Sequence, residues 1–178
     1  AYMVQSQNKL ISSLVAGDET PRDECVLTSI EFSAGATEFQ GKPIVSVFVD
    51  GDNLASQEIA GIQSTHSDSN GIKDEVLEAA KHVQTYHVDV HNRRMPREVR
   101  LKFTNDLWQA GKQNGDRNVI LADLTINGHN VPEQQVSVAP DQKVVLASKR
   151  AVMYENSEIV YTGPFVAGCS LSAVAAAH

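Results

Sequence analysis

The sequence has few cysteines, few aromatic residues and no long apolar run, and each shortage excludes a class of protein. Its 178 residues include only two cysteines, Cys25 and Cys169, near opposite ends of the chain. That spacing excludes the zinc sites that are built from closely paired cysteines. The sequence leaves open whether the two cysteines form one disulfide bridge or stay as two buried thiols, because bridging depends on a distance between them in the folded chain.

Positive charge is also scarce. Asp and Glu (22) outnumber Lys and Arg (15), which gives a formal net charge of −7. Nonspecific nucleic-acid binding needs a basic surface that neutralises phosphates, so we expect no nucleic-acid partner. The one basic concentration, HNRRMPR at residues 91–97, is interpreted as a solvated hairpin connection. No apolar run approaches the ~20 residues that cross a bilayer, so we expect no membrane span.

Alternation of apolar and polar residues is the main positive signal. In residues 98–104, Val99, Leu101 and Phe103 fall on one face and polar residues on the other, which predicts a half-buried strand. Residues 119–126 are more continuously apolar, as expected for a strand in the middle of a packed sheet. Eight or nine such short strands predict an all-β sandwich. The other predicted strands lie at residues 26–34, 43–49, 86–90, 135–139, 143–150 and 158–163.

Turns and one helix complete the predicted elements. Asp50-Gly51 and Asn127-Gly128 are strong turn signals at the ends of strands. Residues 72–84 have apolar positions at helical spacing, which predicts a short amphipathic helix, capped by the polar stretch HSDSN before it. We divide the chain into an N-terminal extension or docking arm, residues 1–23, and a β-sandwich domain, residues 24–178.

The segment between the strands at 98–104 and 119–126 is unusually rich in oxygen-bearing side chains. It contains Asp106 and Asp116 and three amides, Asn105, Asn114 and Asn118. Calcium takes six to eight oxygen ligands from such groups. The spacing does not match an EF-hand, which has alternating acids between two helices. From these residues alone, loop 105–118 is either a solvated connection with Asx turns or a cation site.

The order of residues around this loop is similar to that in a known protein family. Phe103, Asn105 and Asp106 form a Phe-x-Asn-Asp motif, and Asp116-Arg117-Asn118 opens a strand that ends in Asn127-Gly128. This order resembles calcium-dependent carbohydrate-binding modules of the xylan-binding type, over about residues 28–130. The resemblance implies a secreted, non-catalytic jelly-roll β-sandwich with one short helix. It also implies that a calcium ion holds a polysaccharide or other glycan by two neighbouring sugar hydroxyls.

The resemblance also implies residue roles. Asp106 and Asp116 are the expected carboxylate ligands of calcium, with Asn105 and Asn118 as further members of the metal site. Trp108 and Asp116 are the expected carbohydrate contacts; the ring of Trp108 either stacks on a sugar face or packs the loop onto the sandwich. For Arg117 the residue type itself favours structural support, in which it fixes the Asp carboxylates by a bidentate bond, over direct contact with a sugar. Asp116→Ala is expected to remove calcium binding without unfolding the sandwich.

The sequence departs from the family pattern at one strand position and in its aromatic content. Ala122 stands where the family has Asp, and Asp123 follows one place later, on the opposite face of a regular strand. Asp123 therefore does not replace the missing ligand, although Asp50 or Asp52 could if their loop lies beside the site. Only 6% of the residues are aromatic, fewer than a sugar binder would use. These departures support an alternative: an extracellular, self-assembling homo-oligomer joined through its terminal segments, with calcium only stabilising a loop.

Overall fold

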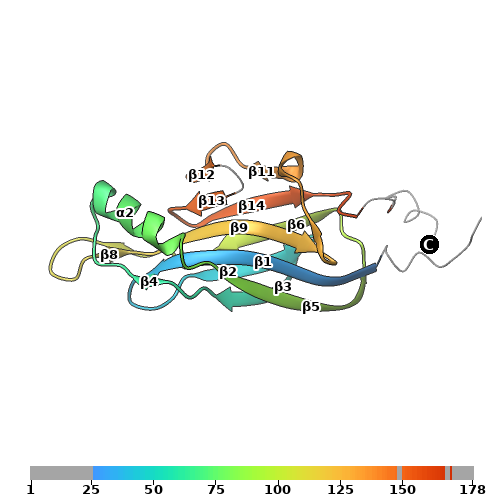
Figure 1. Cartoon of the computed structure of the whole chain (residues 1–178), viewed down its shortest axis with the longest axis horizontal. Helices are drawn as coiled ribbons and strands as arrows, with labels where there is room; N and C mark the ends of the chain where they lie inside the picture. Colours follow the sequence, from blue (N-terminus) through green and yellow to red (C-terminus); the bar gives the residue numbers. More distant parts are fainter. Residues whose placement is uncertain (1–25, 148–149, 167–168, 170–178) are drawn as a thin grey trace, which may run out of the picture.

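The computed structural model describes residues 26–147, 150–166 and 169. In these residues two β-sheets pack face to face, with one α-helix at one end of an elongated body (Figure 1). The prediction of an all-β sandwich with one short helix is therefore confirmed. Cys169 is disulfide-bonded. Cys25, the extension at residues 1–23 and the tail at residues 170–178 lie outside the described residues.

The first sheet has the strand order β12-β13-β9-β1-β4, with β10 paired to β9 and β5 paired to β1. The second sheet has the order β11-β14-β6-β2-β3, and β7 and β8 form a separate hairpin. The first-sheet strands are β1 (Val26–Glu38), β4 (Ile62–Gln63), β5 (Gln84–Arg94), β9 (Asn118–Ile126), β10 (His129–Asn130), β12 (Val144–Ala147) and β13 (Arg150–Met153). The second-sheet strands are β2 (Ile44–Val49), β3 (Asp52–Glu58), β6 (Glu98–Phe103), β11 (Val136–Val138) and β14 (Ser157–Thr162). The remaining elements are β7 (Trp108–Gln109), β8 (Gly115–Asp116), the helix α2 (Ser69–Ala79) and the 3-10 turn η2 (Glu133–Gln135).

Strand periodicity places the core between the sheets. Val99, Leu101 and Phe103 of β6 are fully buried, as the alternation of this segment predicts. Strand β9 lies between β1 and β13, which confirms the prediction of a central strand. It is apolar on both faces because Leu121 enters the core between the sheets while Ile120 packs against α2. Burial of these side chains is the main stabilising term, at roughly 25 cal/mol per Å² of apolar surface.

Both predicted turns form as tight hairpins. Asp50 and Gly51 have φ of 48° and 89°, and Asn127 and Gly128 have φ of 49° and 79°. Two consecutive positive φ values are typical of the turn whose twist matches that of the flanking strands, and Asn-Gly and Asp-Gly adopt it most readily.

The helix begins and ends earlier than predicted. It spans Ser69–Ala79 instead of residues 72–84. Asp68, inside the predicted capping stretch, accepts hydrogen bonds from the backbone N–H groups of Asn70 and Gly71. The prediction extended too far because Gln84 already belongs to β5, where it pairs with Ala34. Neither the apolar residues at helical spacing nor the capping residue indicates where the helix ends and the next strand of the sheet begins.

The interpretation of residues 91–97 as a solvated hairpin connection is wrong. Strand β5 belongs to the first sheet and β6 to the second, so this segment crosses between the sheets. Met95 and Pro96 are buried at the crossing, and Asp50 accepts hydrogen bonds from the N–H groups of Arg97 and Glu98. The sequence analysis gave weight to the basic residues and overlooked Met95 and Pro96, the apolar pair that is buried where the chain passes between the sheets.

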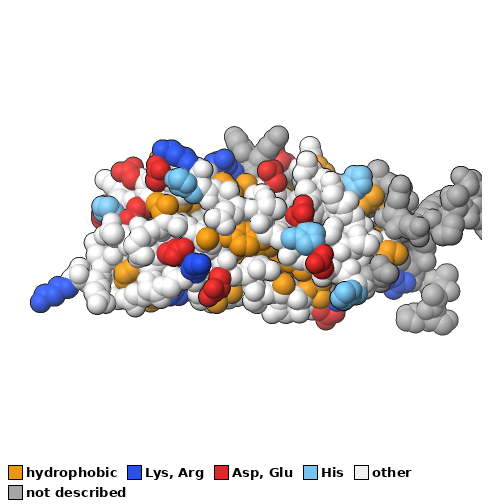
Figure 2. Space-filling model, turned by 60° about the horizontal axis from the view of Figure 1, so that its bottom comes forward, with side chains coloured by type: hydrophobic (Ala, Val, Ile, Leu, Met, Phe, Trp, Pro, Cys, Tyr) orange, Lys and Arg blue, Asp and Glu red, His pale blue; other side chains and the backbone are white. Residues whose placement is uncertain are grey.

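Figure 2 shows acidic and basic side chains interspersed over one face of the molecule, where they do not gather by sign. The described part of the chain has no helix with the length and hydropathy needed to cross a membrane.

Candidate functional site

Loop 105–118 passes from one sheet to the other. It leaves β6 of the second sheet at Phe103 and enters β9 of the first sheet at Asn118. On the way it forms the β7–β8 hairpin, in which Trp108 pairs with Asp116. The hairpin extends from the end of the sandwich that carries α2 (Figure 1).

The two predicted carboxylates meet in one cavity. Asp106 and Asp116 line a space of about 500 Å³, which we call the loop cavity. Trp108, Tyr154 and Glu155 line it as well. Its remaining wall comes from the first turns of α2, through Ser69, Ile72 and Lys73. Three acidic groups, two from loop 105–118 and one that follows β13, therefore border the same space.

Asp116 is a buried carboxylate whose ionised form receives little stabilisation from its neighbours. Asp116 is 4% exposed. The Nδ2 group of Asn118, a fully buried residue, donates a hydrogen bond to Oδ2 of Asp116 at 3.0 Å. Burial raises the pKa of Asp116 to about 6. The hydrogen bond from Asn118 opposes this rise, whereas the negative charges of Asp106, Glu75 and Glu155 add to it. Burial and the negative charges therefore outweigh the hydrogen bond at Asp116, although Lys73 also lines the loop cavity.

Three side-chain oxygens of the loop are buried without a partner among the residues that the structure describes. They are Oδ1 of Asp106, Asn114 and Asn118. Burial also raises the pKa of Asp106, against a lowering hydrogen bond from the backbone of Leu107. Buried acceptors normally have a donor, because an unsatisfied one costs about 1–3 kcal/mol. A bound cation would satisfy such oxygens.

Asn105 and Arg117 are engaged with the main chain. Asn105 accepts from the N–H of Ile44 at 2.6 Å and donates to the carbonyl of Lys42 at 2.9 Å. Arg117 donates to the carbonyls of Asn105, Phe39 and Gln40, where the sequence analysis expected a bidentate bond to carboxylates. Both residues hold the end of β1 and the start of β2 against the loop.

Trp108 is the exposed aromatic residue of the site. Its residue is 56% exposed, while its Nε1–H donates to the carbonyl of Ser67 at 2.9 Å. That bond fixes the edge of the ring against the segment before α2 and leaves the ring largely in solvent beside the loop cavity. An amphipathic ring in this position can stack on an apolar face of a ligand.

Asp50 and Asp52 do not complete the site. Asp50 caps the start of β6, and Asp52 pairs with Arg93. Loop 105–118 follows the other end of β6, about 20 Å away along a strand of this length. Asp123 is also remote, since it lies seven residues beyond Asp116 along β9, roughly 23 Å.

Helix α2 supports the loop through a buried carboxylate that the sequence analysis missed. Glu75 accepts hydrogen bonds from Ser64 Oγ at 2.6 Å, from Thr65 N at 2.7 Å and Oγ1 at 3.2 Å, and interacts with His66 Nδ1 at 2.7 Å. Ser64 Oγ also accepts from the N–H of Asp116 at 2.9 Å. Burial raises the pKa of Glu75, but the hydrogen bonds from Ser64, His66 and Thr65 prevail and lower it. The helix is thereby linked to the backbone of Asp116.

Sequence reasoning did not select some residues of loop 105–118 and of the loop cavity. Asn114 was visible as a loop amide but was not assigned to the metal site. Tyr154 and Glu155 follow β13, far from the loop in sequence, and nothing in their local pattern marks them. Gly115 is required for packing, because a Cβ there would lie 2.2 Å from the Phe39 ring.

The donor set fits a hard cation. Within the described residues, no group of three or more His, Cys, Asp or Glu side chains is arranged to hold a metal ion. What the loop provides is two carboxylates and amide oxygens, of which three oxygens are buried without a partner. Oxygen ligands of this kind suit calcium and lack the imidazole or thiolate groups that favour zinc or copper.

Two solved structures are similar to this chain. A comparison with curated proteins finds no match. Among solved structures, the selenomethionine form of vCBM60 has 19% identity and a TM-score of 0.45, and the match covers 76% of this chain and 90% of that chain. The structure of vCBM60 in complex with galactobiose has 19% identity and a TM-score of 0.43, with 75% and 97% covered.

The family comparison covers more than half of the chain. The model of CBM60, described as a Ca-dependent carbohydrate-binding module that is xylan-binding, matches residues 29–141. This confirms the resemblance found in the sequence, and the expectation of a non-catalytic protein agrees with it. The chain therefore belongs to the CBM60 family of carbohydrate-binding modules.

Proposed function

We propose that this chain binds a polysaccharide at the loop cavity through a calcium ion held by Asp106 and Asp116. The observation that carries the proposal is that, in the part of the chain that the structure describes, three of the four buried side-chain oxygens without a partner lie in loop 105–118; the fourth is Thr125 Oγ1. Two of them belong to Asp106 and Asn118, which the sequence selected as members of the metal site. A calcium ion would satisfy acceptors that otherwise cost free energy.

The residues of the loop cavity and of loop 105–118 have distinct roles in this proposal. Asp106 and Asp116 supply negative charge to the ion, with Oδ1 of Asn118 and Asn114 as neutral oxygen donors. The calcium ion, when bound, offers its open positions to sugar hydroxyls. Asn105 and Arg117 position the loop through main-chain carbonyls and do not contact the ion. The exposed ring of Trp108 stacks on the apolar face of a neighbouring sugar.

Two further observations support a sugar as the ligand and secretion of the chain. The neighbour vCBM60 is described in complex with galactobiose, which favours a sugar as the ligand class. Cys169 is disulfide-bonded, as is typical of proteins in oxidising compartments, and we propose that the chain is secreted. The self-assembly alternative rests on residues 1–23 and the C-terminal tail, which lie outside the described residues.

Calcium titration tests the metal site. Protein stripped with EDTA is expected to gain thermal stability as calcium is added, by roughly 2.7 kcal/mol at a hundredfold excess over the dissociation constant. Asp116→Asn and Asp106→Asn are expected to abolish this gain while they leave the metal-free protein folded. Asp123→Asn, the same change remote from the loop cavity, serves as the matched control and should behave as wild type. A wild-type response in Asp116→Asn would disprove the assignment.

Sugar binding tests the rest of the proposal. Isothermal titration with galactobiose and with xylan oligosaccharides is expected to show binding in calcium and none in EDTA. Trp108→Ala should weaken binding by roughly tenfold, whereas Trp108→Phe, which keeps a ring, should retain part of the affinity. Equal binding in calcium and EDTA would contradict a role for the ion in holding the sugar.

A further inference from the structure

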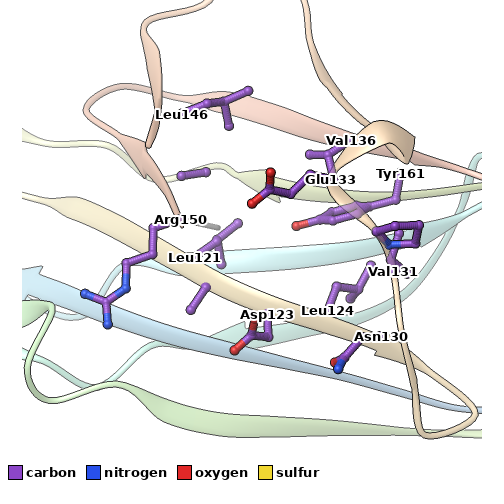
Figure 3. Close-up of a pocket in the computed structure, with 13 residues that line it drawn as sticks. Leu121, Asp123, Leu124, Asn130, Val131, Glu133, Val136, Leu146, Arg150 and Tyr161 are labelled. Carbon is purple, nitrogen blue, oxygen red and sulfur yellow. The ribbon is translucent and has the colours of Figure 1, made fainter. Parts of the chain in front are cut away.

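A second cavity, of about 490 Å³, lies on the same sandwich away from loop 105–118 (Figure 3). We call it the sandwich cavity. Its walls come from β9, β12 and β13 of the first sheet, from β11 and β14 of the second, and from the segment that leads into η2. Most of its lining is aliphatic and includes Leu121, Leu124, Val131, Val136 and Leu146. Cavities of this size and character are typical of small-molecule sites.

A β-bulge in β9 shapes this cavity. Phe32 and Ala34, two residues apart on β1, pair with Leu124 and Leu121, which are three residues apart on β9. The extra residue lets Leu121 and Leu124 both face the core, so Ala122 and Asp123 occupy the bulge and line the cavity. A bulge re-aims side chains and locally breaks strand pairing, and bulges are frequent next to binding sites.

The Tyr161 hydroxyl is an unpartnered polar group inside this cavity. Tyr161 is 5% exposed, and its hydroxyl points into the space between the sheets (Figure 3). Within the described part of the chain, that hydroxyl makes no hydrogen bond. Burial, and secondarily the negative charge of Asp123, raise the pKa of Tyr161, so the hydroxyl stays protonated and able to donate. A hydroxyl that lines a cavity and has no partner among the described residues can donate a hydrogen bond to a ligand and accept one from it.

The mouth of the cavity carries charged groups that are available to a ligand. Asp123, Glu133 and Arg150 are exposed, and none of them forms an ion pair with another described residue. Figure 3 shows the Glu133 carboxylate above the Tyr161 hydroxyl, both directed toward the cavity. Two carboxylates against one guanidinium give the mouth a net negative charge, which disfavours an anion.

We propose that the sandwich cavity is a second binding site, for a small neutral or cationic molecule with an apolar ring and O–H or N–H donors. Its ring contacts the aliphatic walls between β9 and β11. One polar group of the ligand exchanges a hydrogen bond with the Tyr161 hydroxyl. A donor or ammonium group at the other end meets Asp123 and Glu133 at the mouth. The site requires no calcium and shares no lining residue with the loop cavity.

Three matched probes test this proposal on the full chain. Tyramine, 4-ethylphenol and 3-(4-hydroxyphenyl)propanoate share a phenol ring and differ in charge. Each is titrated in EDTA while backbone amide shifts are followed by NMR. We expect tyramine and 4-ethylphenol to shift the amides of residues 121–124 and 131–136, and the anion to bind at least about fivefold more weakly than tyramine. Shifts absent at millimolar probe, or scattered over loop 105–118, would overturn the proposal.

Two substitutions separate binding from folding. Tyr161→Phe removes a hydroxyl that has no partner, so the melting temperature should be unchanged or higher while the affinity for tyramine falls about five- to tenfold. Val136→Phe places a ring in the cavity from the short edge strand β11 and should abolish the shifts. Tyr154→Phe, the same change in the loop cavity, is the control and should bind tyramine as wild type. Undiminished binding by Tyr161→Phe and Val136→Phe would refute the site.

Discussion

At the scale of single residues, Asp116 determines what the loop cavity can do. It is a buried carboxylate surrounded by other acids, with one amide donor on Oδ2. Ionising such a group without a cation is unfavourable, so the site favours either a proton or a metal ion. The same burial that makes Asp116 costly to the metal-free fold makes it a strong ligand when calcium is present.

This gives a pH dependence with a definite sign. In calcium-free protein the folded-state pKa of Asp116 is about 6, above its ordinary value of 3.8. The folded state therefore holds the proton more tightly than the unfolded state, and stability falls as the pH rises from 3.8 to 6. The loss attributable to this group is at most about 3 kcal/mol, from 1.36 kcal/mol per pKa unit. Calcium affinity should rise over the same window, because the ion displaces the proton.

The measurement is thermal unfolding between pH 3.5 and 7.5 in EDTA, with wild type and Asp116→Asn side by side. Other carboxylates titrate in both proteins, so the difference between the two curves isolates Asp116. Asp116→Asn should gain relative to wild type as the pH rises. A constant difference across the range would show that Asp116 has an ordinary pKa.

At the scale of elements, helix α2 covers part of the sandwich and anchors the loop. Val76 and Ala79 cover Ile120 on the outer face of β9. Glu75, on the same helix, binds the segment at Ser64–Thr65, and Ser64 in turn binds the backbone of Asp116. The helix therefore couples strand packing to the geometry of the proposed metal site.

Glu75→Gln tests this coupling. The amide places an N–H₂ group against the donors of Thr65 and His66 or against the hydroxyl of Ser64, so we expect a loss of about 1–3 kcal/mol in the free energy of unfolding. Calcium affinity should fall as well, because the backbone at Asp116 loses part of its support. Glu78→Gln is the matched control on the same helix: its carboxylate binds Lys81 at the surface and should change stability little. Urea unfolding gives the comparison, and equal effects would argue against the anchor.

At the scale of the whole molecule, the core between the two sheets supplies stability and leaves the loop free for binding. Leu101 of β6 is fully buried, whereas Leu77 of α2 is 67% exposed. Leu101→Ala should cost 2–5 kcal/mol through lost burial and a residual cavity, as is usual for core leucines. Leu77→Ala should change the free energy of unfolding by roughly 0.5 kcal/mol or less. Chemical denaturation measures both, and similar values would mean that the core is not where the structure places it.

Local patterns identified much of this fold before the structure. Alternation in β6, the continuous apolar run of β9 and the two Gly-containing turns depend on neighbouring residues only, and all were confirmed. The connection at residues 91–97 was misread because nothing local shows that β5 and β6 lie in different sheets. The early end of α2 has the same cause, since competition with β5 is a tertiary effect.

The features of the candidate site also divide into those that the local sequence indicates and those that only the packing of the fold creates. By itself the sequence determined the family motif and an oxygen-rich loop between two strands, because residue type and order are local properties. Only the tertiary structure decided that Glu155 and Glu75 approach Asp116, that Arg117 binds carbonyls, and that a bulge at Asp123 borders a second cavity. These arrangements depend on how two sheets and a helix pack. Packing brings together side chains that are far apart along the chain, and no local pattern records that.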